Sequence, residues 1–243
     1  MAEKEHIIEG ISPGERYSRT VKLVGEEGLA KLRSAKVLII GNGGVGSYAA
    51  EAIARSGAGS VTLMDGDTVQ PSNLNRQLVA LTSTLGRNKA EVMAERIRDI
   101  DPDTKVEALA RFYLVDDELD LTLYDWIVDA IDDVNAKTAL IRTAVEKGVN
   151  IISAMGAAGK FGTAFRVADI SKTSTCPLAK VMRKRLRDLG IEHLPVVFSD
   201  EKPVPRNGEL GTLSYVPGAA GLCLAGYVIR EITGCPPKEI RRA

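Results

Sequence analysis

The stretch that most constrains the fold covers residues 35–46 and joins a short apolar segment to a cluster of glycines. Residues 35–40 are mostly apolar and rich in β-branched side chains, which is typical of a buried strand in a parallel sheet. The glycines at 41, 43 and 46 fit the spacing G-x-G-x-x-G, and residues 47–55 continue as a helix. Gly41 permits the tight turn, Gly43 lets a phosphate approach the backbone, and Gly46 lets helix and strand pack closely. Because the N–H groups at such a helix start favour an anion, the stretch predicts a nucleotide-binding site.

Strand and helix patterns alternate along the rest of the first half. Further strands are predicted at 60–64, 106–110, 124–130 and 150–154, with helices at 86–100 and 134–147. This alternation indicates an α/β fold with a Rossmann-like, doubly wound, mostly parallel sheet.

The pattern changes after residue 162. Residues 163–170 and 193–199 alternate like antiparallel strands, and residues 218–233 form an apolar helix. No linker-like composition marks the change. We therefore expect one domain over 1–243, with a nucleotide-binding part at 15–160 and a smaller mixed or antiparallel C-terminal extension at 161–243 that binds the substrate.

Composition limits the partners and the compartment. The chain has 32 Lys and Arg against 32 Asp and Glu, so any contact with nucleic acid requires a local basic patch. Cys176, Cys223 and Cys235 show no C-x-x-C spacing, which argues against a structural zinc and fits a reducing compartment. The charged amino terminus lacks the apolar core of a signal peptide, and no segment suits a membrane span. These features predict a cytoplasmic protein.

Polar residues follow the second predicted strand. Asp65 ends it roughly 20 residues after the glycines, where a Rossmann unit places its ribose-binding acid, and an NAD-dependent dehydrogenase would explain this much equally well. The loop at 67–77 is rich in amide side chains and lies where doubly wound sheets bind ligands, although surface loops often have this composition. Lys89 lies in the first turn of the next helix, where a cation opposes the helix dipole, so we expect an anion nearby.

Acidic residues follow the strand predicted at 124–130. Asp129, Asp132 and Asp133 would reach the carboxyl edge of the sheet. Two or three carboxylates there suit a magnesium ion whose other ligands are water and phosphate. The alternative is that Asp132 or Asp133 caps the helix at 134–147. Capping and metal binding are equally good interpretations for Asp133, and capping is the weaker one for Asp132.

Together these pieces resemble the ThiF/MoeB/E1 superfamily of adenylating enzymes. The resemblance rests on an ordered set of motifs: Arg16-Tyr17-Ser18-Arg19, Gly41-x-Gly43-Gly44-x-Gly46, Met64-Asp65-x-Asp67-x-Val69, Ser72-Asn73-x-x-Arg76-Gln77, Lys89-Ala90-Glu91 and Asp129-Ala130-Ile131-Asp132. It implies that the cofactors are ATP and magnesium rather than a dinucleotide.

The same resemblance implies roles for individual residues. The four glycines and Asp67 would surround the nucleotide, and Asp65 would hold the ribose hydroxyls. Asn73, Arg76 and Lys89 would hold the phosphates, and Asp132 would bind magnesium. Arg19 would act as an arginine finger from the partner subunit of a homodimer. The catalytic residues would then be Arg19, Arg76, Lys89 and Asp132. In the implied reaction a substrate carboxylate attacks the α-phosphate of ATP, and the three cations, with the metal that Asp132 binds, would neutralise the negative charge that accumulates.

The second half of the chain selects a branch of this superfamily. It lacks the paired C-x-x-C motifs of sulfur-carrier-activating members, and Cys176 is a better candidate for a helix start than for a thioester. Residues 169–179, 197–199 and 211–225 resemble the tRNA threonylcarbamoyladenosine dehydratases. This implies that a carboxyl adenylate forms on N6-threonylcarbamoyladenosine beside the anticodon, and that a group of the same modification displaces AMP to close a ring. An activating enzyme for a ubiquitin-like or sulfur-carrier protein is the alternative.

A tRNA substrate requires a phosphate-binding surface. Lys180, Arg183, Lys184 and Arg187 lie at i, i+3, i+4 and i+7 of a basic helix and share one face. Such a charge run is more often a solvated surface, but in a chain without net charge it is the best candidate for binding the tRNA backbone. The sequence leaves open whether a monovalent cation joins magnesium and whether a cysteine desulfurase or sulfur-acceptor protein binds.

Overall fold

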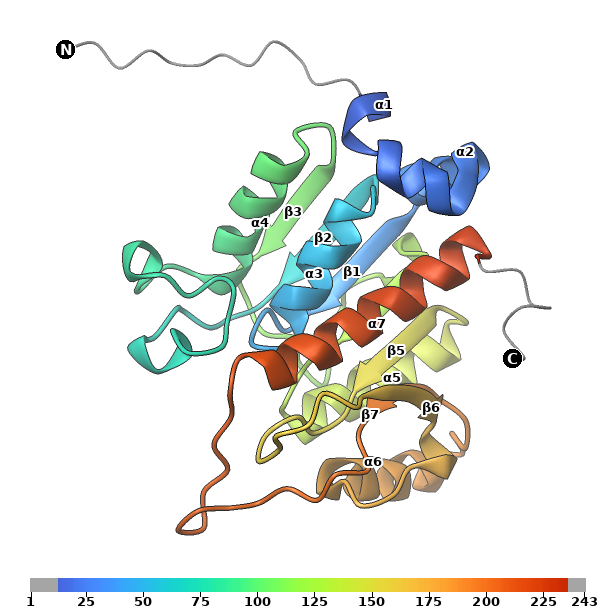
Figure 1. Ribbon diagram of the computed structural model, residues 1–243. Helices are drawn as coiled ribbons and strands as arrows, with labels where there is room; N and C mark the ends of the chain where they lie inside the picture. The colour runs from blue at the N-terminus through green and yellow to red at the C-terminus, as the bar shows by residue number, and fades with distance from the viewer. Residues whose placement is uncertain (1–12, 236–243) are drawn as a thin grey trace.

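A seven-stranded sheet forms the centre of the computed structural model, which describes residues 13–235 (Figure 1). The strand order is β3-β2-β1-β4-β5-β7-β6. The strands are β1 (Lys36–Ile40), β2 (Ser60–Met64), β3 (Lys105–Leu109), β4 (Trp126–Asp129), β5 (Asn150–Ala154), β6 (Arg166–Asp169) and β7 (Pro195–Phe198). All neighbours pair in parallel except β6, which runs antiparallel to β7. The predicted α/β class with a mostly parallel sheet is confirmed.

Helices cover both faces of this sheet. They are α1 (Pro13–Arg16), α2 (Ser18–Ser34), α3 (Gly46–Arg55), α4 (Lys89–Ile100), α5 (Val134–Glu146), α6 (Pro177–Asp188) and α7 (Tyr215–Thr233). One face packs against α3, α4 and α7, and the other packs against α5 and α6, each over its own apolar core (Figure 1). Strands such as β1 and β4 are buried on both faces, which explains their nearly continuous apolar sequence. No helix in the described part of the chain is long and apolar enough to cross a membrane.

The winding direction of the sheet reverses beside β1. This strand pairs with β2 on one side and with β4 on the other, so the chain crosses to the opposite side after β3. In open α/β sheets such a reversal leaves a crevice outside the carboxyl ends of the strands, and ligands bind there. The topology therefore places the candidate site beyond the ends of β1 and β4.

The C-terminal part continues the same sheet. Strand β7 adds to β5 in parallel and β6 forms the edge, so the predicted extension shares its core with the first half. Helix α7 then returns across the first half and packs against α3 (Figure 1). Gly221 allows this close contact, because a Cβ atom there would lie 2.2 Å from the carbonyl oxygen of Val45. The first turn of α7 consequently reaches the crevice.

Element bounds differ from the predicted ones by a few residues, and local capping explains one difference. The helix predicted from residue 86 begins at Lys89, because the Asn88 side chain accepts the N–H groups of Ala90 and Glu91 as an N-cap. The terminal helix begins at Tyr215 rather than at 218, so Pro217 lies within its first turn, where proline is tolerated.

Candidate active site

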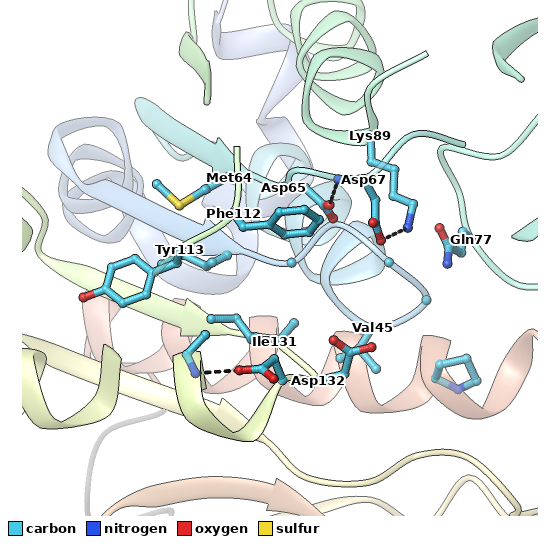
Figure 2. Close-up of a pocket in the computed structure, with 18 of the residues that line it drawn as sticks. Val45, Met64, Asp65, Asp67, Gln77, Lys89, Phe112, Tyr113, Ile131 and Asp132 are labelled. Atoms are coloured by element: carbon cyan, nitrogen blue, oxygen red, sulfur yellow. Dashed lines mark hydrogen bonds and ion pairs between the residues drawn. The ribbon is translucent and has the colours of Figure 1, made fainter. Parts of the chain in front are cut away.

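A cavity of about 560 Å³ opens at the predicted crevice (Figure 2). It is bounded by the glycine loop, the carboxyl ends of β1 and β2, the segments that follow β2, β3, β4 and β5, and the start of α7. In Figure 2, Asp65, Asp67, Lys89 and Gln77 lie on one side of the loop, and Ile131 and Asp132 lie on the other. A pocket of this size, formed at a topological switch point, suits a small organic ligand.

The glycine loop has the geometry that its spacing predicts. Gly41 has φ of +88°, a left-handed conformation that favours glycine. A Cβ atom on Gly46 would lie 1.7 Å from the carbonyl oxygen of Gly41, so only glycine lets α3 start this close to β1. Gly43 and Gly44 both line the cavity, where their lack of side chains leaves the backbone accessible to a ligand. The loop can therefore present N–H groups at the start of α3 to an anion.

Asp65 is a buried carboxylate at the end of β2. Its Oδ2 accepts the Asn42 N–H at 2.6 Å, and its Oδ1 accepts the Asp67 N–H at 2.9 Å. Burial raises the pKa of Asp65 above its usual range, although these two N–H groups and the charge of Lys89 act in the opposite direction. Each carboxylate oxygen has more than one acceptor position, so Asp65 keeps the capacity to accept ligand hydroxyl groups.

The anion expected beside Lys89 is Asp67. The Lys89 ammonium lies 2.7 Å from the Asp67 carboxylate in the cavity wall (Figure 2). The Lys89 side chain is 7% exposed, whereas that of Asp67 is 56% exposed. A bound phosphate could therefore compete with a partly solvated carboxylate for a cation that the protein already holds in place.

The segment after β2 contributes Arg76 and Gln77 to the cavity but not Asn73. Arg76 donates to the Ser72 carbonyl at 2.8 Å, which holds its guanidinium along the loop. Asn73 is buried, and its Oδ1 accepts the N–H of Gln70 and so closes the turn. Asn73 thus does not line the cavity, and one oxygen of its amide serves the turn. Its predicted phosphate contact stays a prediction.

Gln77 is a cavity residue to which the sequence pattern assigned no role. It is buried, and its Oε1 has no hydrogen-bond partner within the described residues. The same holds for Oδ1 of Asn42 in the glycine loop. A buried amide oxygen left unpaired costs about 1–3 kcal/mol, so these two atoms indicate a site that gains partners when a ligand or water enters. The only sequence signal for Gln77 was its place next to Arg76.

Two of the three predicted acidic residues, Asp132 and Asp133, line the cavity, and Asp129 does not. Asp129 is fully buried and is bound by Lys137 Nζ at 2.9 Å and by Ser153 Oγ at 2.6 Å. Asp133 caps α5 by accepting the N–H groups of Asn135 and Ala136, so the capping interpretation is correct for it. Asp132 is exposed and lines the cavity. The cavity thus gathers two of these carboxylates rather than three. No group of three or more possible metal-ligating acids, histidines or cysteines exists within residues 13–235, and magnesium binding stays a prediction.

An apolar wall lines the cavity beside Asp65, and the sequence patterns did not predict it (Figure 2). Phe112, Leu114 and Val115 line the cavity with exposed fractions of 58%, 56% and 55%. The Phe112 ring lies directly against Gly66, where a Cβ atom would approach its Cδ2 to 2.5 Å. Apolar side chains that are exposed together inside a pocket favour a flat apolar ligand group. No periodicity marked this segment, because it is an irregular connection after β3.

The other predicted residues lie away from the cavity. Arg19 is exposed on α2, a helix that precedes β1 and lies at the opposite edge of the sheet (Figure 1). Lys180, Lys184 and Arg187 are exposed on α6, whereas Arg183 is half-buried and donates to the Thr173 carbonyl at 2.9 Å. Arg183 therefore serves first as a link between α6 and the segment before it.

The three cysteines take structural positions. Cys176 is 3% exposed and forms the N-cap of α6, as its place before Pro177 suggested. Cys223 is half-buried rather than buried, because its position on α7 lies at the margin of the core. Burial still raises the pKa of the Cys223 thiol. Cys235 is half-buried at the end of the described chain.

Comparisons with known proteins agree with this geometry. The ThiF family profile matches residues 17–243. A tRNA threonylcarbamoyladenosine dehydratase of Bacillus subtilis (strain 168) is 39% identical, covering 89% of this chain and 94% of that protein. The protein of the same name from Escherichia coli (strain K12) is 41% identical over 73% of this chain and 68% of its own length. The crystal structure of E. coli tRNA N6-threonylcarbamoyladenosine dehydratase, TcdA, in complex with ATP has a TM-score of 0.85 and 34% identity, covering 96% of this chain and 100% of that one. This chain belongs to the ThiF family.

Proposed function

We propose that this chain is an ATP-dependent dehydratase that converts N6-threonylcarbamoyladenosine in tRNA to its cyclic form. The observation that carries the proposal is the cavity at the switch point, where glycine N–H groups, Arg76, Lys89 and Asp132 surround one space. The similarity to dehydratases along nearly the whole chain supports the choice of substrate.

The residues of the cavity fit ATP. The open backbone at Gly43 and Gly44 suits a phosphate, and Asp65 has acceptor capacity for ribose hydroxyls. The apolar wall formed by Phe112, Leu114 and Val115 suits the adenine ring. The unpaired Oε1 of Gln77 could accept one hydrogen bond from the bound nucleotide or from a water molecule. Asp132 would be one ligand of a magnesium ion that keeps its remaining positions for water and phosphate oxygens, which is how magnesium is commonly held.

The reaction proceeds by two substitutions that balance as a loss of water. A carboxylate oxygen of the modification bonds to the α-phosphorus of ATP, and the bond from that phosphorus to pyrophosphate breaks. A nucleophile within the same modification then attacks the activated carbonyl carbon, loses its proton and expels AMP, which retains the carboxylate oxygen. No protein nucleophile is required, so the buried Cys176 is consistent with this route and disfavours a thioester.

The cavity residues would act through position and charge. Lys89 would exchange Asp67 for a phosphate oxygen, and Arg76 would neutralise charge on the equatorial or leaving oxygens. Glycine N–H groups would orient the nucleotide. Arg19 lies on the opposite edge of its own chain, so its proposed role requires a homodimer in which the partner's α2 reaches the cavity.

We assign the two parts of the chain different tasks. Residues 15–160 contribute most of the nucleotide cavity, and residues 161–243 contribute α6 and the segment before α7, which would bind the RNA. On α6 the exposed Lys180, Lys184 and Arg187 stay candidates for backbone contacts, with Arg183 limited by its bond to Thr173.

The proposal is tested by incubating modified tRNA with the protein, ATP and magnesium, followed by mass spectrometry of the nucleosides. We expect the threonylcarbamoyladenosine to lose the mass of one water, with one AMP formed for each conversion. Arg76→Ala should slow conversion by about a thousandfold, or about 4 kcal/mol in the barrier. Unchanged nucleosides together with AMP formation driven by a small carrier protein would instead support the alternative activating enzyme.

A further inference from the structure

A second concave surface lies between α5 and α6, next to the main cavity. This α5–α6 groove has a volume of about 360 Å³ and is lined by Val115, Asn135, Thr138, Arg142 and Arg185 with two apolar neighbours. Two of its lining residues are arginines, and none of the described residues that line it is acidic. The rest of the lining is apolar or uncharged, so all of its charged side chains are cationic. A concave surface of this kind favours an anion such as a phosphate next to the two guanidinium groups.

The groove adjoins the candidate active site. Val115 lines both the cavity and the groove. The first turns of α5 also separate the two spaces: Asp133 and Ala136 face the cavity, and Asn135 and Thr138 face the groove. A polymer with one unit in the cavity would therefore lay a neighbouring unit across the groove.

The two flanks of α6 differ in their relation to this path. Arg185 donates to Asn135 Oδ1 on α5 at 2.6 Å, so its flank faces the groove. Arg183 donates to Thr173, so its flank faces the segment before α6. With about 100° between successive residues, Lys180 and Arg187 fall on the Arg183 side of the buried row formed by Ala179, Met182 and Leu186. Lys184 lies nearly opposite that row, at an equal angle from Arg183 and Arg185. The flank with the largest charge is thus not the flank beside the cavity.

Both groove arginines are available to bind a phosphate. Arg142 has an ion pair of 3.9 Å with Glu146, an exposed residue one turn away, and such pairs contribute little. Arg185 has used one of its five N–H donors on Asn135, which fixes the guanidinium while leaving donors free for a second acceptor. The planar fork of arginine matches two phosphate oxygens at once.

We propose that the α5–α6 groove binds the phosphate backbone of the RNA strand beside the modified adenosine, with Arg142 and Arg185 as its ligands. The inference rests on the proposed function, because it takes the modified nucleoside to occupy the main cavity. The α5–α6 groove would position the strand, and it lies on a different side of α6 from the exposed Lys180.

The test compares two double variants that remove the same charge. One is Arg142→Gln with Arg185→Gln, and the matched control is Lys36→Gln with Lys105→Gln, two exposed lysines at the amino ends of β1 and β3, away from the cavity. The probe is a fluorescent anticodon stem-loop carrying threonylcarbamoyladenosine, with anisotropy measured over a range of salt concentrations. Loss of two single-strand phosphate contacts should reduce the slope of log K against log salt by about 1.4, and raise Kd about 20-fold at about 0.1 M salt.

ATP binding and the melting temperature should stay unchanged in both variants, since all four side chains lie on the surface and outside the cavity. The control variant should keep its Kd within about twofold, because its two charges do not contact the strand. Two outcomes would contradict the proposal that the groove binds the RNA strand. One is an arginine variant with the wild-type Kd and salt slope, and the other is a control variant that loses as much affinity as the arginine variant. Failure of the function itself is seen separately, because the unaltered chain would then not dehydrate the stem-loop.

Discussion

Two buried aspartates at opposite edges of the sheet have opposite environments. Asp65 lies at the carboxyl edge beside the cavity, and Asp101 lies at the amino edge after α4. Asp101 is fully buried, and its carboxylate accepts hydrogen bonds from Arg16, Tyr17 and Arg33. Asp65 accepts only two backbone N–H groups. Counting Thr104, four side chains donate to Asp101, whereas within the described residues Asp65 accepts hydrogen bonds from backbone only and lines the cavity.

The difference appears in how each carboxyl group titrates. Burial alone would raise the pKa of Asp101, but hydrogen bonds from Tyr17, the Asp103 N–H and Thr104 outweigh it, so the pKa lies below its usual range. Around Asp65 burial prevails and its pKa is raised. A buried acid that the protein leaves under-satisfied beside a cavity is a mark of a functional site, and a saturated one is a mark of structure. The carboxyl edge is thus built for a ligand and the amino edge for stability.

The largest effect that separates the ligand-binding edge from the structural edge is expected for Lys89→Ala. Removing the cation from the cavity should lower kcat/KM for dehydration by about a thousandfold, which is about 4 kcal/mol of transition-state stabilisation. The melting temperature should change little, because the partner carboxylate of Asp67 is more than half exposed and becomes solvated. Steady-state kinetics and thermal melting measure the two effects on one sample. A Lys89→Ala protein with a much lower melting temperature but wild-type kcat/KM would contradict the distinction between the two edges.

Asp101→Asn should give the opposite outcome. It removes the charge that Arg16 and Arg33 share at the amino edge, and breaking such a pair costs about 3 kcal/mol of unfolding free energy. Urea denaturation with a constant m-value measures this loss. The kcat of the folded protein should stay at the wild-type value, because the cluster does not border the cavity. A large fall in kcat at temperatures where the variant is folded would contradict the assignment.

The sequence predicted what depends on short-range chemistry. The glycine loop and the order of strands and helices follow from residues within a few positions of one another. For Asp133 the local sequence left capping and metal binding equally open, and the structure shows the cap. Pairings between distant elements were not predictable in this way. Asp129 binds the side chains of Lys137 and Ser153 rather than a metal, and these contacts depend on the packing of β4, α5 and β5 against one another. The Phe112 wall was missed because an irregular loop carries no periodic signal.

The smallest expected effect is a difference in the pH dependence of stability between the two aspartates. The folded-state pKa of Asp101 is lowered, so its stabilising contribution is present above the unfolded pKa of about 4 and is lost as pH falls through the folded value. The folded-state pKa of Asp65 is raised, so its contribution is present below about pH 4 and is lost as pH rises through the folded value. Each unit of pKa difference corresponds to about 1.4 kcal/mol.

Comparing Asp101→Asn and Asp65→Asn with the wild type isolates these terms from the other titrating groups. The destabilisation by Asp101→Asn should shrink as the solution is acidified below about pH 4, because the wild type then loses the same charge. The destabilisation by Asp65→Asn should instead grow on acidification, since the wild-type carboxyl becomes protonated and no longer opposes folding. Urea titrations on both sides of about pH 4 measure both trends, because the Asp65 term changes above this pH and the Asp101 term below it. Parallel trends for the two variants would show that the two buried acids experience the same environment, and would remove the physical basis for assigning the cavity edge to the ligand.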